Sequence, residues 1–574
     1  MNVWDKIKSW GRGLMQRTAT ATGIAREFKD IFELGDVPAF NQFYYYGIFV
    51  WKALYRGLYK DWHVVPVIAV GAKPGQTRQL FRLNTAKAVS AELASLVWGE
   101  EAQFSVSTNG WVEQRNEDGI VTNPDPLKGF VEDVLRRNAF GEKLQELVEQ
   151  GLALGGASIK VWAEPERKGL PQSPSATAPS ERATPSDPLR GPAPSGREPF
   201  GVRLGYVMAD QFVPLAWDNA RVTEGVFISR RARKGWYYTR LEWHRWNGET
   251  YVITNELYKS EMQRGAMAGM NQDILGIRCP TAELQEMFPG LEPETVVPVE
   301  ESLFSYFRTP IANNIDDNSP LGVSIYANAL ETLHAIDICY DSFVTEFRLG
   351  KKKIIVPARF LRMVTDPQTG RQVRYFDPND ETYVGVADDD GTAGVHDISV
   401  ELRVEEHVAA LNALLSILCL QIGFSANTFS FDEHQGGIKT ATEVVSENSK
   451  TYKTVRTVQN QLRPMLEHMV QNIIDVAVLY GMEWEGQSVE RLAAGGWEVK
   501  VTFDDGVTQD RQTNLNEGVM LVGAGLLSKY KFLTDKKFGQ GLTDKEAADE
   551  LQRIRDEHQQ TVNEEQVRLY GGGA

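Results

Sequence analysis

The sequence predicts a mixed α+β fold, with short strands in its first half and long helices in its second. Between residues 319 and 480, apolar residues recur at alternating spacings of three and four, the period of one helix face. Residues 200–254 instead hold short runs rich in Val, Tyr, Trp and Thr, separated by turn signals as in strands. A hydrophobic content of 42% supplies large cores. The 574 residues correspond to about four structural units at ~150 residues each.

Charge, cysteines and hydropathy exclude several classes of protein. With 61 Lys and Arg against 77 Asp and Glu, the formal charge is −16, which argues against tight sequence-specific DNA binding. Three widely spaced cysteines and no Cys/His cluster predict reduced thiols, no metal and no cofactor. The apolar run 43–51 is shorter than the ~18 residues of a membrane span, and no other stretch is expected to do better. We expect a soluble protein made inside a cell, with this run as a buried aromatic-rich element.

The first half is expected to contain two helices before its strands. Residues 84–98 are predicted to form the first, with Asn84 or Thr85 as its cap and three residues on one apolar face (Val89, Leu93 and Leu96). Residues 126–150 are predicted to form the second, ending at Gly151. Strands are then expected at 236–243 and 249–254.

Residues 165–199 stand out by composition. They contain nine of the 25 prolines and five serines, with almost no large apolar side chains. Such a segment cannot bury enough surface to offset the entropy lost on ordering, so it is predicted to be a disordered surface insertion. Residues 151–162 before it and 202–226 after it both look strand-like. The insertion is therefore expected to decorate a hairpin within one domain.

A long helix is predicted to start at Ser319, where a capping hydroxyl is followed by a proline at the first helical position. Its apolar face has spacings of 3, 4, 3 and 4 (Leu333, Ile336, Tyr340, Phe343 and Phe347). It is expected to stop at Gly350, before a β-rich stretch of about 50 residues that is full of Asp-Pro and Asp-Gly turn signals.

Two further long helices are expected around a glycine-containing loop. The first covers 401–425, and the loop follows it. The next opens with a capping box, Thr440 with Glu443, and runs toward Tyr480, with Pro464 expected to kink it. The narrow apolar stripes fit either an ordinary helical bundle with a hairpin insertion or helices that pack against neighbouring copies in an oligomer.

The last 80 residues are expected to be smaller elements. Residues 497–503 alternate like a strand, and a short helix is expected near 513–526. A second capping box, Thr543 with Glu546, opens a helix with three residues on one face (Ala547, Leu551 and Ile554).

The order helix, β module, helix, loop and long helix resembles the stem, clip, stem, tunnel loop and wing of tailed-bacteriophage portal proteins. Local phrases match a siphophage-type subfamily and run in the same order along the chain: Gly151-Leu-Ala-Leu-Gly-Gly156, Ala209-Asp-Gln-Phe-Val-Pro214 with Trp217-Asp218, Gly437-Ile-Lys-Thr-Ala-Thr-Glu-Val444 and Ala524-Gly-Leu-Leu-Ser528. The resemblance covers roughly residues 40–560, with the Pro/Ser-rich insertion outside it.

The resemblance implies a portal-type architecture within the α+β class. Its parts would be an N-terminal wing (1–318), a stem helix (319–349), a clip (350–400), a second stem helix (401–425), a tunnel loop (426–440), a long kinked wing helix (441–495) and a crown with the C-terminal region (496–574). It also implies a homo-oligomeric ring, usually a dodecamer, assembled in the host cytoplasm at one capsid vertex. Double-stranded DNA would pass through the ring without sequence specificity during packaging and ejection. The implied protein partners are terminase, major capsid and scaffolding proteins, and head-completion or adaptor proteins, with no membrane.

Two sets of residues are candidates for function under this resemblance. The loop would line the narrowest part of the channel and grip or gate DNA (Phe429, Phe431, Asp432, Glu433, His434, Gly436, Gly437 and Lys439). Alternatively, both phenylalanines pack in the subunit core and the glycines only end a turn. A basic run would dock the motor or touch DNA at the clip, or would simply be a solvated helix end (Lys351, Lys352 and Lys353).

No catalytic residues are predicted. The chain has no phosphate-binding GxxxxGK[ST] loop, so it is not itself a nucleotide-driven motor. The Asp388–Gly391 run lacks the spacing of a calcium loop and is expected to be a solvated turn. Two alternative functions remain: another virion component, such as an adaptor or head-completion protein, or a hydrolase that uses a carboxylate pair from 377–397.

Overall fold

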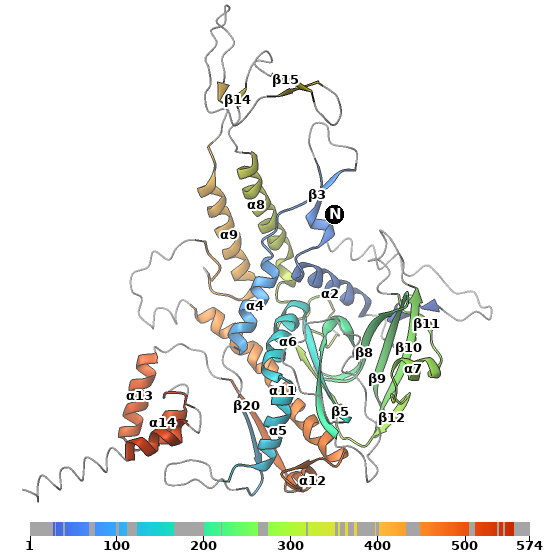
Figure 1. The fold of residues 1–574 in the computed structure, drawn as a ribbon, viewed down its shortest axis with the longest axis vertical. Coiled ribbons are helices and arrows are strands. Elements are labelled where there is room, and N and C mark those ends of the chain that lie inside the picture. The colour runs from blue at the N-terminus through green and yellow to red at the C-terminus, as the bar shows by residue number, and fades with distance from the viewer. Residues whose placement is uncertain are drawn as a thin grey trace, which may run out of the picture.

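The computed structural model of the chain describes residues 27–28, 30–37, 41–67, 75–98, 103–111, 123–165, 200–219, 221–261, 274–316, 319–349, 354–355, 362–365, 372–375, 396–397, 401–426, 428–431, 448–503, 511–535, 539–542 and 546–555. Figure 1 shows a mixed α+β body, a pair of helices that projects from it, and a separate cluster of C-terminal helices. The predicted fold class is therefore confirmed at the level of α+β.

The centre of the body is a layer of helices packed on a three-stranded sheet. The helices are α2 (Asn41–Tyr55), α4 (Thr85–Trp98), α5 (Pro126–Arg137), α6 (Phe140–Leu154) and α11 (Ser449–Leu479). The sheet has the order β13-β5-β6. The run 43–51 lies in α2, where Tyr44 and Trp51 are buried as predicted, although Phe49 is 56% exposed. In α4, Val89 and Leu93 face the core, but Leu96 is exposed and Val97 takes its place.

The helix predicted over 126–150 is two helices. Asp125 caps α5 by accepting the Leu127 N–H at 2.9 Å. Ala139 adopts a left-handed conformation (φ 49°) and breaks the chain direction between α5 and α6. The Asn138 amide bridges this break by donating to Val134 and Val202 carbonyls. The second helix also runs through Gly151 and ends at Gly155.

The Pro/Ser-rich insertion connects two paired strands, as predicted. β5 (Gly156–Pro165) and β6 (Phe200–Met208) are antiparallel, with their last pair at Pro165 and Phe200. Residues 166–199 themselves lie outside the described residues. The other edge of β5 pairs with β13 (Phe304–Arg308).

A larger, peripheral sheet has the order β1-β11-β10-β9-β8-β7, with β12 also paired to β10. Its strands are β1 (Glu27–Phe28), β7 (Phe212–Asp218), β8 (Arg221–Arg233), β9 (Trp236–Asn247), β10 (Thr250–Glu261), β11 (Gly276–Arg278) and β12 (Glu294–Val297). The predicted strands at 236–243 and 249–254 are thus confirmed and belong to one long hairpin. Short helices η1 (Ile31–Glu33), η2 (Ala209–Gln211) and α7 (Thr281–Met287) accompany the sheet.

The long helix predicted from Ser319 begins eleven residues later, because α8 spans Leu330–Leu349 after a short helix η3 (Ala327–Ala329). Residues 319–326 instead cross the body as a buried non-helical segment. The Ile325 N–H donates to the Leu152 carbonyl at 3.0 Å. Gly322 lies so close to Gly155 that a Cβ on either would meet the other's carbonyl oxygen at 2.4 Å. These tertiary contacts override the local Ser-Pro helix signal.

The helices α9 (Val404–Ile422) and α11 lie where the sequence predicted them, and α11 continues through Pro464 without ending. The Thr440–Glu443 capping box lies outside the described residues. Between α8 and α9, the β module contains the pairs β14 (Ile354–Ile355) with β17 (His396–Asp397) and β15 (Arg362–Thr365) with β16 (Gln372–Tyr375). Its β-rich character is confirmed by these strands.

The remaining elements complete the body and the C-terminal cluster. β20 (Trp497–Thr502) is a strand as predicted and pairs with β4 (Gln103–Thr108). The short helix expected near 513–526 is α13 (Arg511–Gly523), followed by α14 (Lys529–Thr534) and a helix over 546–555 that buries Ala547 and Leu551. Smaller elements are α3 (Lys60–His63), β2 (Val64–Pro66), β3 (Thr77–Gln79), β18 (Glu483–Trp484), β19 (Gln487–Ser488) and α12 (Val489–Ala493).

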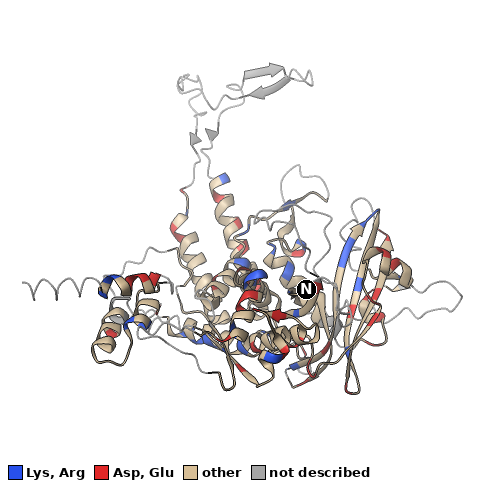
Figure 2. Ribbon diagram, turned by 60° about the horizontal axis from the view of Figure 1, so that its bottom comes forward, with Lys and Arg blue, Asp and Glu red and all other residues tan. Residues whose placement is uncertain are grey.

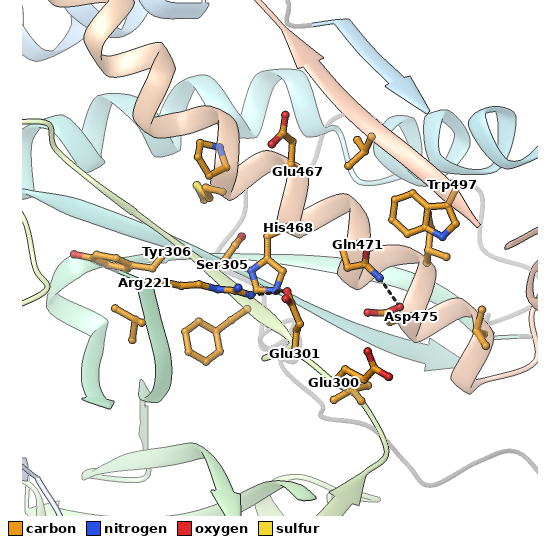
Figure 3. A pocket seen from close by; sticks show the side chains of 18 of the residues that line it. Arg221, Glu300, Glu301, Ser305, Tyr306, Glu467, His468, Gln471, Asp475 and Trp497 are labelled. Atoms are coloured by element: carbon orange, nitrogen blue, oxygen red, sulfur yellow. Dashed lines mark hydrogen bonds and ion pairs between the residues drawn. The ribbon is translucent and has the colours of Figure 1, made fainter. Parts of the chain in front are cut away.

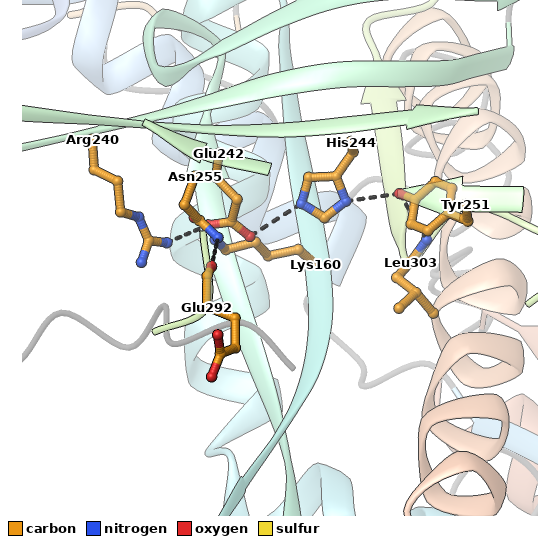
Figure 4. A network of polar contacts seen from close by, with 8 residues as sticks. All are labelled: Lys160, Arg240, Glu242, His244, Tyr251, Asn255, Glu292 and Leu303. Atoms are coloured by element: carbon orange, nitrogen blue, oxygen red, sulfur yellow. Dashed lines mark hydrogen bonds and ion pairs between the residues drawn. The ribbon is translucent and has the colours of Figure 1, made fainter. Parts of the chain in front are cut away.

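A buried charged network joins the two sheets (Figure 4). Lys160 on β5 donates to the Glu242 carboxylate on β9 at 2.6 Å, and Arg240 donates to the same oxygen. His244 contacts the other Glu242 oxygen at 3.1 Å and the Tyr251 hydroxyl at 2.7 Å. The ionised Glu242 carboxylate can only accept, so a neutral His244 carries its proton on Nε2 and its Nδ1 accepts from the Tyr251 hydroxyl. That hydroxyl also accepts the Leu303 N–H.

Burial lowers the pKa of His244, which predicts a specific loss of stability in acid. An unfolded His244 binds a proton below about pH 6.5, whereas the folded side chain resists protonation. The free energy of unfolding should therefore fall as the pH drops below that value, by up to ~1.4 kcal/mol per pH unit. The free energy of unfolding, measured by denaturant titration at several pH values, should fall less steeply with decreasing pH in His244→Gln than in the native chain. An equal dependence on pH in both chains would show that His244 is not the group whose protonation destabilises the fold.

Candidate functional site

The helices α8 and α9 form an antiparallel pair that projects from the body toward β14 (Figure 1). Toward the body, they bury apolar side chains from both helices (Leu333, Ile336, Leu411, Leu415, Leu418 and Ile422). The two helices are therefore one packed unit at their base, and their outer ends carry the β module between them.

A charged clamp closes the outer end of the pair. The Glu346 carboxylate on α8 accepts the Arg403 N–H at 3.0 Å and its guanidinium at 2.8 and 3.0 Å. His407 on α9 contacts the same carboxylate at 2.8 Å. The hydrogen bonds from Arg403 lower the pKa of Glu346 to about 2, so this carboxylate stays ionised. The Phe343 ring packs against His407 beside the clamp.

The base of α8 is fixed by two carboxylates one turn apart. Asp337 contacts His63 Nε2 at 2.9 Å and accepts the Leu83 N–H at 3.1 Å. Asp341 accepts the Phe81 N–H at 3.0 Å and both Arg78 guanidinium nitrogens at 2.7 and 2.8 Å. These bonds hold the chain around β3 along α8, so the helix cannot rotate without breaking them.

The helix α9 carries more apolar surface than the chain buries. By length and composition, this 19-residue helix is long and apolar enough to cross a membrane. This corrects the expectation that no stretch of the chain is long and apolar enough. Only 28% of its apolar 18-residue window is buried within the chain. Ile417 is 47% and Leu420 is 70% exposed. Together with three exposed alanines, they form one stripe at helical spacing, here called the α9 stripe (Ala409, Ala410, Ala413, Ile417 and Leu420).

The segment after α9 is tied to the start of α11. Gly423 ends α9 in a left-handed conformation (φ 87°), and its carbonyl accepts the Thr454 hydroxyl at 2.7 Å. Ser425 and Thr451 then bond reciprocally, because each backbone N–H donates to the other's hydroxyl, at 2.8 and 3.3 Å. Phe424, next to Gly423, is buried in the main core.

The two phenylalanines of the predicted loop have different surroundings. Phe429 packs against the core beside Phe424, with ring centroids 5.4 Å apart. Phe431 is 53% exposed, and its N–H donates to the Asn412 side chain on α9 at 2.9 Å. The loop therefore starts by folding back along α9. The other candidate residues lie outside the described residues (Asp432, Glu433, His434, Gly436, Gly437 and Lys439, and Lys351, Lys352 and Lys353 at the β module).

The residues that position this site were not found by sequence reasoning. The clamp joins residues 57 positions apart, and the Ser425–Thr451 pair joins residues 26 apart. Ser, Thr, Asp and Arg at such separations form no recognisable spacing. The exposed Ala-rich face of α9 did carry a signal, because small side chains at helical spacing leave room for a neighbouring helix to pack closely.

A hollow of about 1060 Å³ lies between α11, β20 and the chain around β13 (Figure 3). At one side, Glu301 contacts Arg221 at 2.5 Å and His468 at 3.1 Å. The hydrogen bond with His468 is the largest cause that lowers the pKa of Glu301, and with the contribution of Arg221 this pKa falls to about 2. At the other side, burial raises the pKa of Asp475, which accepts a hydrogen bond from Gln471 at 2.9 Å.

The hollow has mixed charge but holds no nucleophile activated by a base. Two of its carboxylates have side-chain partners: Glu301 contacts Arg221 and His468, and Asp475 accepts a hydrogen bond from Gln471. Among the described residues, no group of three or more His, Cys, Asp and Glu is arranged to hold a metal ion. The geometry thus favours packing and assembly over bond-breaking chemistry.

Comparison with protein families identifies the class. A model of phage portal proteins matches residues 40–564, nearly the span over which the resemblance was predicted. Portal proteins are structural, non-enzymatic components of the virion that form a homo-oligomeric ring at the capsid vertex. The chain belongs to the family described as phage portal protein, SPP1 Gp6-like. The hydrolase alternative is therefore wrong. A search of curated proteins finds no match to this chain.

The reciprocal Ser425–Thr451 bonds predict the effect of a single substitution. Thr451→Val removes a hydroxyl that accepts a buried N–H, which should destabilise the chain by ~1–3 kcal/mol and increase hydrogen exchange in residues 423–431. The matched control is Thr457→Val, because the exposed Thr457 hydroxyl bonds only within its own helix. Unchanged exchange in Thr451→Val would show that the loop is held by other contacts.

Proposed function

We propose that the ring built from this chain is the conduit through which double-stranded DNA enters and leaves the capsid, with α8 and α9 as its stem. The observation that carries this proposal is the α9 stripe, which a single chain leaves exposed. A ring supplies a second copy next to each chain, and the side of that copy can cover the stripe.

The stripe has the composition of a helix contact rather than of a solvated face. Alanines at its outer part allow close approach of a neighbouring helix, and Ile417 and Leu420 supply apolar area nearer the body. The clamp at Glu346 and the bonds of Asp337 and Asp341 fix the orientation of the pair. Pre-ordered helices lose little entropy when copies associate, which supports a stem built in this way.

The other parts follow the portal order in this proposal. Residues 1–318 with α11 form the wing, the module between α8 and α9 forms the clip, residues 426–440 form the tunnel loop, and 496–574 form the crown. The stem helix starts at Leu330, where α8 begins. We further propose a dodecamer that docks terminase during packaging and head-completion or adaptor proteins afterwards, and that assembles with major capsid and scaffolding proteins.

The charge of the chain suits passage of DNA without tight binding. Twelve copies at −16 each carry about −192, a field that repels phosphates and disfavours sticking. Figure 2 shows acidic residues on the projecting helices as well as on the body. Local cations such as Lys439 or Lys351 to Lys353 would then touch the backbone only weakly.

The loop after α9 is proposed as the element that contacts DNA. Phe431 is exposed and Phe429 is anchored, so the described part of the loop has one fixed and one free aromatic ring. The following Asp432, Glu433 and His434 precede Gly436 and Gly437, which permit backbone conformations closed to other residues.

Charging the α9 stripe should prevent ring formation. Because Ile417 and Leu420 are exposed in the single chain, the double variant Ile417→Asp/Leu420→Asp should fold with a free energy of unfolding within ~0.5 kcal/mol per site of the native chain. Light scattering and negative-stain imaging should then show single chains instead of rings. Asn247→Asp/Thr250→Asp, which also adds two negative charges but at an exposed turn of the peripheral sheet, should still form rings. Rings from the Ile417→Asp/Leu420→Asp variant would refute the stem contact.

Shortening the loop should affect DNA and not assembly. Deletion of residues 432–436 is expected to leave ring formation intact and to lower the length of packaged DNA or its retention, measured by sizing DNA from purified particles. A deletion of equal length within 171–195, in the Pro/Ser-rich insertion, is the control and should package normally. Normal DNA length in the loop deletion would exclude a role in gripping or gating.

A further inference from the structure

The tip of the β8–β9 hairpin has an unusual combination of tight geometry, charge and exposure. A two-residue turn, Lys234-Gly235, joins the strands, and both residues are left-handed, with φ of 49° and 85°. This is the turn that matches the twist of paired strands, so the hairpin stays regular to its end. Arg233 and Trp236 face each other directly across the turn.

Toward this tip, β8 runs beyond its neighbour. β7 pairs with β8 from Asp218 opposite Arg221 to Phe212 opposite Phe227, and there β7 begins. Beyond Phe227, no strand among the described residues lies on that side of β8. Because the two-residue turn makes Arg233–Trp236 a hydrogen-bonded pair, Ala232 occupies a non-hydrogen-bonded position. Its N–H and C=O therefore point away from β9, toward the open side.

The side chains at the tip are those of a binding surface. Trp236 is 39% exposed, and Ala232, Arg233 and Lys234 are exposed. The Arg233 guanidinium rests against the Met287 sulfur at 2.9 Å, which pre-positions it. Trp and Arg are the residues most enriched at energetically important contacts between proteins.

The tip is also where positive charge on the peripheral sheet is not neutralised. Elsewhere on the sheet, Lys259 pairs with Glu283 at 2.9 Å and Arg278 pairs with Glu256 at 2.6 Å. In the described part of the chain, Arg233 forms no ion pair, and neither does Lys234. Figure 2 shows Lys and Arg gathered along one strand of this sheet, on a chain whose total charge is −16.

We propose that the open edge of β8 at residues 228–233 binds an extended, acidic segment of a partner protein, which adds to the sheet as a further strand. Outward-pointing backbone groups supply the main-chain hydrogen bonds of strand addition. Arg233 and Lys234 select for carboxylates, and Trp236 offers an apolar contact at the end of the open edge. The proposal concerns the peripheral sheet and does not depend on the assignment of α8 and α9 as the stem.

Two simpler explanations give different expectations. Charges on an exposed edge strand can serve only to prevent aggregation, but either sign would do this, and an exposed Trp236 beside the edge would work against it. A basic strand can also bind DNA, but then duplex phosphates would compete with the peptide, and backbone groups at the edge would be irrelevant.

The test is a binding measurement on the full chain, with a fluorescein-labelled peptide of alternating glutamate and valine about eight residues long. Fluorescence anisotropy should show saturable binding that weakens with salt. Arg233→Ala/Lys234→Ala and, separately, Ala232→Pro should each weaken binding by about tenfold or more, at unchanged melting temperature. The matched control Lys259→Gln/Arg278→Gln, which also removes two cations from this sheet, should bind within twofold.

Three outcomes would overturn the proposal. A peptide N-methylated at alternate residues that binds as tightly as the parent would show that no strand is added. A DNA duplex that displaces the acidic peptide at equal phosphate and carboxylate concentration would assign the tip to nucleic acid. An Arg233→Glu/Lys234→Glu variant that still binds the acidic peptide would show that the tip is not the site.

Discussion

The apolar face that α9 cannot bury within its own chain is the constraint from which the rest of the structure follows. Exposure of Ile417 and Leu420 to water costs free energy in a single chain, and in the proposed ring an identical copy would cover these side chains. The α9 stripe can contact a second copy in one defined way only if the orientation of α9 relative to the body is fixed. The bonds of Asp337, Asp341 and Glu346 fix α8, and α8 in turn fixes α9.

The body behaves as a rigid support for this pair. The segment 319–326 is buried and bonds to α6 through Leu152 before α8 begins, and the approach of Gly322 to Gly155 leaves no room for a side chain at either. The charged network around Glu242 then connects that sheet to the peripheral one. Because separating Lys160 from Glu242 would leave an uncompensated buried charge, this ion pair favours one relative placement of the two sheets.

The parts of the fold that depend on local periodicity were predictable. The helices α9 and α11, the β9–β10 hairpin and the pairing that flanks residues 166–199 all follow from apolar spacing and turn chemistry in the sequence. The break at Ala139 and the late start of α8 were not, because each depends on contacts between distant segments: Asn138 with Val202, and Ile325 with Leu152. Of the candidate site, the position of the loop after α9 was predictable. The hydrogen bonds of Ser425 and Asn412 that hold its start were not, because no spacing rule links them to their partners.

The distribution of charge fits the two tasks proposed for this chain, passage of DNA and recognition of partner proteins. A conduit for DNA needs little attraction to phosphate, and the overall excess of carboxylates provides this. An assembly component needs local attraction to its partners, which a uniformly acidic surface would not give. Lys259 and Arg278 form ion pairs within the peripheral sheet, so they stabilise it without leaving net positive charge on its surface. In the proposed strand addition, the cations left without carboxylates at the tip of the β8–β9 hairpin would select the partner on the peripheral sheet and not on α8 or α9, so that recognition and the proposed passage of DNA would not compete.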